Sequence, residues 1–573
     1  MTEPLFYADI RLQLKTATKH KLAERRISIL AALSGFSEPG YQKLTVTTNA
    51  LVTLSTRIKN HCDNFKLYKL THRLPSILTV NSLVLSSGEI ASLYHLPDSK
   101  ISRAENTVTA LSRTLPLPAP VKQAVDNKKC DVYVGVNSHR GEDTPIGLTE
   151  DERAKHIYVV GGTGSGKTTM LEYMAIQDIL SGHGLAVIDP HGDLVRSLIG
   201  HIPSSRLKDV VYFDPADLAH PIGLNLLELP KTLKGDQLEH QQELVCEAVV
   251  SIFRKIFSQD DSGGHRVEYI LRSAILTALT IKGATLFTVL KLIQDPYYRA
   301  RYVNKLDDEA LIDFWKNEFG PAGGMQRVKM SAGVTAKLGR FWHSASARRV
   351  FSQTHSTLDF SDIMDSGKIL LCNFSKGSLG EDVSELFGTA VLAKLQLAAL
   401  KRSVIPVDKR RAFYLYIDEF QNYATDTFVQ MLSESRKYNL RLSIAEQSTS
   451  QQQDRQWVQV ILANVGTVIC FRGGNIKDEE LLLPLFGNSI SPGEIANLPS
   501  YCFYAKFSAL YEPIPAFSGR TILADKSKHM TAAAVIKYSQ DNYGGKYIKP
   551  NYNERKKPGS IRVPKFSYVM RKT

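Results

Sequence analysis

Apolar and polar positions along the chain change their pattern near residue 150, and this change predicts two kinds of structure. Before it, short alternating strands such as Asp131–Val136 mix with helical stretches such as Ala17–Leu33, and the turn-rich segment 137–147 predicts a hairpin. We therefore expect residues 1–150 to form a small N-terminal α+β or barrel-like module. After it, short apolar runs alternate with helical patterns, which is typical of an α/β fold whose parallel sheet is covered on both faces.

The apolar runs of this α/β core fall into two blocks. They are HIYVV (156–160), LAVID (185–189) and VVYFDP (210–215) in the first block, and 368–372, 413–417, 440–445 and 467–471 in the second. Residues 235–350 between the blocks show helical periodicity without a convincing strand, so we interpret them as an all-α insertion. The insertion divides the core into segments 151–234 and 351–525.

The charge of the chain is unevenly distributed and marks out the C-terminal segment. The 573 residues carry a formal charge of +14, and most of the excess lies in residues 526–573, where Lys and Arg alternate with Tyr and Phe. Apolar periodicity fades in this segment, so we expect a mobile basic tail. The aromatic rings and positive charges of this tail suit binding to single-stranded nucleic acid or to an anionic membrane surface. The alternative is that the tail is solvated and disordered and binds nothing.

Composition also excludes some classes of protein. The six cysteines are scattered without a second cysteine or a histidine at ligand spacing, which argues against a zinc site or a disulfide framework. The N-terminus has no long apolar core, and lysines interrupt the most apolar later stretch, 273–293, so we expect no membrane-spanning helix.

The strongest chemical signal is a glycine-rich turn that follows HIYVV and opens a helix. It fits the pattern GxxxxGK[ST] and, with the next threonine, comprises Gly161, Gly162, Thr163, Gly164, Ser165, Gly166, Lys167, Thr168 and Thr169. In such a loop the backbone N–H groups surround phosphates, the lysine reaches the β- and γ-phosphates, and the hydroxyl of Thr168 binds Mg²⁺. ATP and Mg²⁺ are therefore the expected ligands.

An acidic pair and a glutamine follow two later strands. Asp418 comes directly after FYLYI and is expected to hold Mg²⁺ through water, while Glu419 acts as general base on the attacking water. The next strand leads to Gln447, whose amide can sense the γ-phosphate at the carboxyl edge of the sheet. These roles require that the fold bring 418–419 to the glycine-rich turn, far away in sequence.

Two arginines are candidates for a finger that reaches the nucleotide of a neighbouring subunit. Arg436, before the strand 440–445, is preferred to Arg472, which follows the strand 467–471, and a surface ion pair is the alternative for Arg436.

The segment DPHGD (189–193) has two interpretations. We interpret it first as a tight turn that leads to a helix capped by Asp193. The alternative is that Asp189 or His191 contacts the nucleotide or its metal ion.

Taken in order, the glycine-rich turn, DPHGDL, YIDEFQNYAT, SESRKYNL, AEQSTSQQ and NVGTVICFRGG resemble the TraG/TraD-like coupling ATPases of type IV secretion and conjugation, within the HerA/FtsK superfamily of P-loop motors. The resemblance covers about residues 5–525. It implies a RecA-like core in a hexameric ring that threads DNA through its channel. It also implies catalytic roles for Lys167, Thr168, Asp418, Glu419, Arg436 and Gln447.

The resemblance leaves the biological task open. Such coupling proteins are typically anchored by N-terminal transmembrane helices, and we expect none in this chain. Either a separate membrane subunit would link it to a secretion channel and a relaxase, or the chain is a HerA-like helicase in DNA processing or a secretion-assembly ATPase. The expected location is the cytoplasm, with attachment to the inner face of the cell membrane left open.

Basic residues late in the insertion are candidates for sequence-blind phosphate contacts in a DNA channel. They are Arg327, Lys329, Lys337, Arg340, Arg348 and Arg349, together with Lys376 in the loop after the strand 368–372. A solvated surface is the alternative for each of them.

Overall fold

The computed structural model describes residues 5–8, 18–34, 83–88, 112–230, 233–257, 265–449, 455–473, 476–508, 514–525 and 529–545. The chain forms two compact units, Met1–Thr109 and Ala110–Thr573. In the first unit, β1 (Leu5–Ala8) pairs antiparallel with β2 (Leu83–Ser86), and the helix expected at 17–33 is α1 (Lys19–Ser34).

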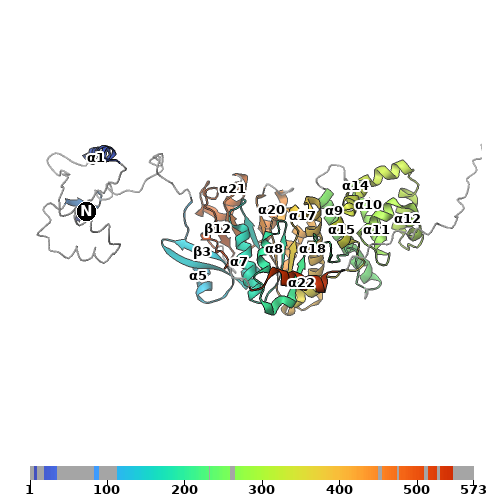
Figure 1. Ribbon diagram of the computed structural model, residues 1–573. Helices are drawn as coiled ribbons and strands as arrows, with labels where there is room; N and C mark the ends of the chain where they lie inside the picture. The colour runs from blue at the N-terminus through green and yellow to red at the C-terminus, as the bar shows by residue number, and fades with distance from the viewer. Residues whose placement is uncertain are drawn as a thin grey trace, which may run out of the picture. The chain divides into compact units, whose positions relative to one another are not determined.

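A mixed sheet, eleven-stranded within the described residues, organises the second unit (Figure 1). Its centre is parallel, in the order β11 (Thr467–Phe471), β5 (Ile157–Val160), β10 (Leu440–Glu446), β9 (Phe413–Ile417), β6 (Gly184–Asp189), β8 (Ile369–Asn373) and β7 (Val210–Phe213). These strands coincide with the apolar runs in the sequence, and nearly all their residues are buried. The α/β fold class predicted from the sequence is confirmed.

Antiparallel strands extend the sheet beyond β11, in the order β12 (Cys502–Phe507), β13 (Phe517–Arg520), β3 (Cys130–His139) and β4 (Glu142–Thr149). The predicted hairpin is thus present, and its turn residues Arg140 and Gly141 both have positive φ, as a tight hairpin turn requires. The hairpin joins the large sheet rather than an N-terminal module. The boundary between the units falls after residue 109, not at residue 150, because alternation identifies a strand but not its sheet partner.

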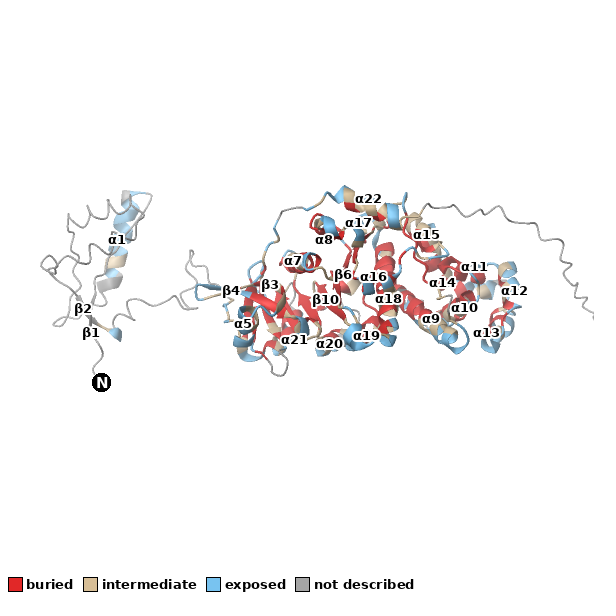
Figure 2. Cartoon of the chain, turned by 90° about the horizontal axis from the view of Figure 1, so that it is seen from below, coloured by how far each residue is buried: buried red, intermediate tan, exposed pale blue. Residues whose placement is uncertain are grey.

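Helices cover both faces of the parallel strands. On one face lie α7 (Lys167–Leu180) and α8 (Asp193–Ile199), and on the other lie α18 (Glu381–Lys401) and α19 (Asp426–Ser435). Other helices of the unit are α5 (Ala119–Asp126), α6 (Glu150–Arg153), α16 (Phe360–Ser366), α17 (Lys376–Leu379), α20 (Arg455–Asn464) and α21 (Ile476–Leu482). Figure 2 shows the buried residues concentrated in the strands and in α18.

α18 is apolar because it lies between the sheet and the insertion. Among the described residues, Glu381–Val404 is the one helical segment long and apolar enough to cross a membrane, yet 67% of its apolar window is buried in the core. Packing against α9, α16 and α19 therefore accounts for its apolar composition.

Between β7 and β8, the described residues from 236 to 351 form helices joined by short turns, without a strand. It comprises α9 (Asp236–Phe257), α10 (His265–Leu279), α11 (Leu286–Gln294), α12 (Pro296–Val303), α13 (Glu309–Asp313), a π-helical turn (Phe314–Phe319), α14 (Gly324–His343) and α15 (Ala345–Phe351). In both views these helices gather at the end of the second unit that is opposite β3 and α5 (Figure 1, Figure 2).

Part of the basic segment 526–573 differs from the expected mobile tail. α22 (Ala532–Tyr543) packs against β7 and α8, and its Val535 is fully buried. Residues 546–573 lie outside the described part of the chain.

Candidate nucleotide-binding site

The glycine-rich turn joins β5 to α7 at the carboxyl edge of the parallel strands. Gly164 and Gly166 have φ angles of 71° and 116°, in the left-handed region that favours glycine. Gly161 needs the absence of a side chain for another reason, because a Cβ there would lie 2.5 Å from the Cβ of Phe471. The local geometry therefore explains three of the glycines in the motif.

Backbone hydrogen bonds fix this turn to the strands on either side of β5. The N–H of Gly161 donates to the carbonyl of Glu446 at the end of β10 (3.2 Å), and the N–H of Gly162 donates to the carbonyl of Arg472 after β11 (2.8 Å). The remaining loop leads into the N-terminus of α7, where unpaired N–H groups and the helix dipole favour phosphate.

Lys167 lies inside the turn. Its ammonium group donates to the carbonyl oxygens of Gly161 and Gly162, and the residue is only 4% exposed. Burial lowers the pKa of Lys167, while Glu419, Asp418 and Glu446 oppose that shift. The side chain is therefore enclosed by the turn and lies near carboxylates that favour its charged form.

The turn meets the acidic pair in space, although β10 separates β5 from β9 in the sheet. The hydroxyl of Thr168 donates to Oδ2 of Asp418, with an oxygen–oxygen distance of 2.9 Å. Burial and the neighbouring Glu419 raise the pKa of Asp418 to about 6, against the stabilising hydrogen bond from Thr168. A divalent cation at these two oxygens would offset the charge that the interior disfavours.

Two amides hold the carboxylate of Glu419. Its Oε1 accepts from Nε2 of Gln447 (2.9 Å), and its Oε2 accepts from Nε2 of Gln421 (2.6 Å). The backbone of Glu419 is in the left-handed region, with φ of 50°, which is uncommon for a residue with a side chain. The structure thus brings Gln447 to the predicted general base and adds Gln421, which sequence reasoning missed.

Glu446 is a second residue that sequence reasoning missed. Its side chain is fully buried at the end of β10 and accepts a hydrogen bond from the hydroxyl of Tyr158 in β5. Burial and Glu446 raise the pKa of Tyr158, which keeps the phenol protonated as a donor. An acid directly before Gln447 was the available signal, because charged residues are rarely buried without a specific partner.

The DPHGD segment forms the predicted turn, but a different residue caps the helix. Asp189 accepts from the backbone N–H groups of His191 (2.8 Å) and Val195 (3.1 Å), so its carboxylate satisfies an N–H of the first turn of α8, whose N-cap is Gly192. The side chain of Asp193 is 84% exposed and pairs with Arg196. Asp193 as the cap was wrong, because the strand end places Asp189 beneath the first turn of α8. His191 is exposed.

Two family models match segments of the chain that contain the residues of this site. A family model described as "Helicase HerA, central domain" matches residues 133–312, and one described as "TraM recognition site of TraD and TraG" matches residues 412–487. The first begins within β3 and contains the glycine-rich turn, and the second contains Asp418, Glu419 and Gln447. By these two matches the chain is similar to the TraG/TraD-like P-loop NTPases of the HerA/FtsK superfamily.

Solved structures show the same fold. The bacterial conjugative coupling protein TrwBdeltaN70, in an unbound monoclinic form, is 16% identical with a TM-score of 0.54, over 73% of this chain and 95% of its own. The plasmid coupling protein TrwB in complex with a non-hydrolysable ATP analogue is 16% identical with a TM-score of 0.53, over 75% of this chain and 98% of its own. A TrwB complex with ADP and Mg²⁺ has a TM-score of 0.52 at 16% identity. No curated protein matches the chain significantly in sequence.

Within this TraG/TraD-like fold, the two finger candidates lie at opposite edges of the sheet. Arg436 is exposed in the turn before β10, at the amino edge, and the preceding Ser435 lies 2.8 Å from Nε2 of the buried His156 at the start of β5. The length of β10 puts Arg436 roughly 20 Å from the glycine-rich turn of its own subunit. Arg472 is exposed beside that turn.

The basic set proposed for a DNA channel is mostly engaged within the chain. Lys337 donates to the carbonyl of Ile256, Arg340 pairs with Asp382, Arg348 donates to the carbonyl of Trp342 and Arg349 donates to the carbonyl of Leu218. Lys376 contacts Glu381 (2.9 Å) and Asn422 (3.1 Å). Within this set, Arg327 and Lys329 are the two residues whose side chains form neither an ion pair nor a hydrogen bond with another described residue, so they are the remaining candidates, at the start of α14.

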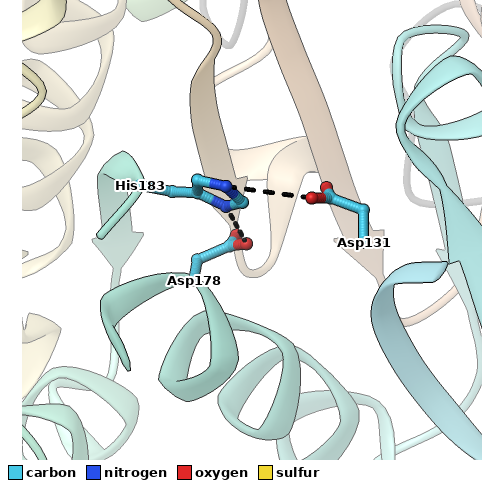
Figure 3. Close-up of side chains that lie close together, drawn as sticks. All are labelled: Asp131, Asp178 and His183. Carbon is cyan, nitrogen blue, oxygen red and sulfur yellow. Dashed lines mark hydrogen bonds and ion pairs between the residues drawn. The ribbon is translucent and has the colours of Figure 1, made fainter. Parts of the chain in front are cut away.

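A second cluster of ionisable groups has metal-ligating residue types but is an ion-pair network. His183 lies 3.1 Å from Asp178 and 3.8 Å from Asp131 (Figure 3). The guanidinium of Arg153, 1% exposed, makes two hydrogen bonds to Asp178 (2.8 and 2.7 Å) and one to Asp131 (2.6 Å). Burial alone would raise the pKa of Asp178, but Arg153 lowers it. Because the arginine supplies the cation, these residues do not fit a metal ion.

Proposed function

We propose that this protein is an ATP-hydrolysing motor that translocates DNA as a ring and serves as the coupling protein of a type IV secretion or conjugation system. The observation that supports it most directly is the hydrogen bond between Thr168 and Asp418. It joins the phosphate-binding turn to the acidic pair, which is the geometry that Mg²⁺-dependent hydrolysis needs.

Each residue of the site has a separate proposed role in hydrolysis. Thr168 and Asp418 offer the hard oxygen ligands that suit Mg²⁺, which when bound would neutralise charge on the phosphates. Lys167 would bind the β- and γ-phosphates from within the turn. Glu419, oriented by Gln421 and Gln447, would accept a proton from the attacking water.

The proposed assembly is a homohexamer that binds DNA without regard to sequence. The family and the amino-edge position of Arg436 support a ring in which each subunit completes its neighbour's site. Membrane-embedded channel subunits and a relaxase are the proposed protein partners, with the motor on the cytoplasmic side of the membrane. The match to a region described as a TraM recognition site of TraD and TraG supports recognition of a partner protein by residues 412–487.

The test of the proposal is the effect of DNA on the ATPase rate. We expect single-stranded or double-stranded DNA of random sequence to stimulate hydrolysis, with an effect that falls as salt rises. Arg327→Glu with Lys329→Glu should weaken this stimulation while leaving the DNA-free rate unchanged. An ATPase rate that DNA does not alter would refute the motor function while leaving the NTPase intact.

A HerA-like helicase in DNA processing is the second candidate, favoured by the match to the HerA central domain. The two candidates differ in their action on forked duplexes. Displacement of a paired strand at the rate of ATP hydrolysis would favour the helicase. Translocation that displaces a bound protein but no paired strand would favour the coupling motor.

Mixed rings test whether Arg436 acts on the neighbouring subunit. Arg436→Ala and Glu419→Gln should each lower the ATPase rate by at least about a hundredfold. In an equal mixture of the two, roughly a quarter of the subunit contacts would combine an intact site with an intact finger, so activity should return. Lys437→Ala, at the exposed neighbouring position, is the matched control and should keep the full rate. No recovery in rings shown to contain both variants would contradict a finger in trans.

A further inference from the structure

Tyr501 has an unusual backbone conformation beside the phosphate-binding turn. It directly precedes β12 and has φ of 66°, in the left-handed region that residues with side chains rarely adopt. Its N–H donates to the carbonyl of Ser165 (2.7 Å), and its carbonyl accepts from the N–H of Thr521 (2.8 Å). These two hydrogen bonds fix the backbone of Tyr501 beside the glycine-rich turn.

The ring of Tyr501 lies against Gly166, the N-cap residue of α7. A Cβ added to Gly166 would lie 3.1 Å from Cδ1 of Tyr501, so the ring is in contact with the N-terminus of α7. The residue is nevertheless 43% exposed. One part of the aromatic side chain thus packs on the turn while another part remains open to solvent.

The order of the strands gives the direction in which a nucleotide would lie. Thr168, Asp418 and Glu419 mark the end for the metal ion and the γ-phosphate, on the β9 side of β5. A triphosphate bound along the turn must therefore direct its nucleoside away from β9. On that side the sheet continues through β11 and β12.

The pairing of β11 with β12 puts Tyr501 at the carboxyl edge of the parallel strands, where the glycine-rich turn also lies. Phe471, the last residue of β11, is the partner of Phe503 in the antiparallel β12. Tyr501 therefore lies beyond the carboxyl end of β11, at the same edge of the sheet as the glycine-rich turn. Its exposed ring is the aromatic surface next to the place where the nucleoside leaves the turn.

We propose that Tyr501 is the stacking platform for the purine base of the bound nucleotide. The inference rests on the proposed function, because it requires that the glycine-rich turn bind nucleotide phosphates. Stacking on an aromatic ring depends on the flat face of the base and not on the hydrogen-bonding groups at the edge of the base. Tyr501 therefore contributes affinity for adenine and guanine nucleotides alike and takes no part in the hydrolytic step.

The test compares ligands with and without a base. Mg²⁺·ADP, Mg²⁺·GDP and Mg²⁺·pyrophosphate are titrated calorimetrically into the full chain and into Tyr501→Leu, Tyr501→Ala and Tyr501→Phe. Leucine keeps apolar bulk against Gly166 but removes the flat ring. We expect leucine and alanine to weaken ADP and GDP by roughly tenfold and to leave pyrophosphate unchanged. Phenylalanine, which keeps the ring, should bind all three as the unchanged chain does.

The controls separate this inference from the proposed function. Tyr297→Ala removes another exposed tyrosine, in α12, and should change no affinity. Equal weakening of ADP and pyrophosphate, or no change in ADP affinity, would overturn the stacking role while the phosphate site stands. An unchanged chain that binds neither ADP nor pyrophosphate would overturn the proposed function, and the inference with it.

Discussion

Replacement of Glu419 by glutamine is expected to lower the ATPase rate by about 10²–10⁴-fold, the range that a positioned general base contributes. The substitution keeps the size of the side chain and its place between Gln421 and Gln447, but an amide cannot accept the proton of the attacking water. Nucleotide binding should persist, because Glu419 does not belong to the phosphate-binding turn. Steady-state phosphate release and ADP calorimetry measure the two properties separately.

Two further variants serve as controls for this result, one expected to lose activity and one expected to keep it. Lys167→Ala should lose both hydrolysis and tight nucleotide binding, because it removes the charge inside the turn. Glu434→Gln changes an exposed acid of α19 whose side chain is 51% accessible, and it should keep the full rate. A Glu419→Gln protein that retains a tenth or more of the ATPase rate would contradict the assignment of the general base.

Replacement of Arg153 by methionine is expected to destabilise the second unit by about 3–5 kcal/mol, because it leaves the charge of Asp178 buried without its partner. Asp178 is fully buried, and its other contacts, with Tyr416 (2.5 Å) and His183 (3.1 Å), do not supply a permanent positive charge. Urea unfolding followed by tryptophan fluorescence and circular dichroism measures the shift.

The control for Arg153 is an ion pair of the same kind at the surface. Arg196→Met breaks the pair with Asp193, whose members are 58% and 84% accessible, and should cost no more than about 1 kcal/mol. Arg153→Met combined with Asp178→Leu should recover part of the loss, because no unpaired charge remains at that position. A single Arg153→Met change that costs no more than the surface pair would show that the network does not stabilise the fold.

The sequence predicted the parallel strands well because their burial on both faces requires continuous apolar runs, such as FYLYI at β9. It also predicted that Lys167 and Thr168 open a helix and that Asp418 and Glu419 follow a strand, and the structure brings these two segments together. It did not predict the sheet that the β3–β4 hairpin joins, because that depends on pairing between Val136 and Arg520, which are far apart in sequence.

Two site residues escaped sequence analysis because their roles depend on side-chain contacts that only the fold reveals. Gln421 and Glu446 look like ordinary polar residues until the fold places them against Glu419 and Tyr158. The basic residues of the insertion showed the opposite error. Their charge suggested a ligand surface, but partners such as Asp382 and the carbonyl of Ile256 already occupy Arg340 and Lys337.

α22 determines where the chain can be shortened without damage. Val535 is fully buried, and the hydroxyl of Ser539 bonds to both backbone groups of Tyr212 on β7 (2.8 and 3.1 Å). Cleavage at residue 525, where the basic segment starts in sequence, would remove this helix and leave the outermost parallel strand open to self-association. A protein that ends after residue 545 would instead keep α22, so that any fall in DNA affinity could be assigned to residues 546–573 and not to the loss of this helix.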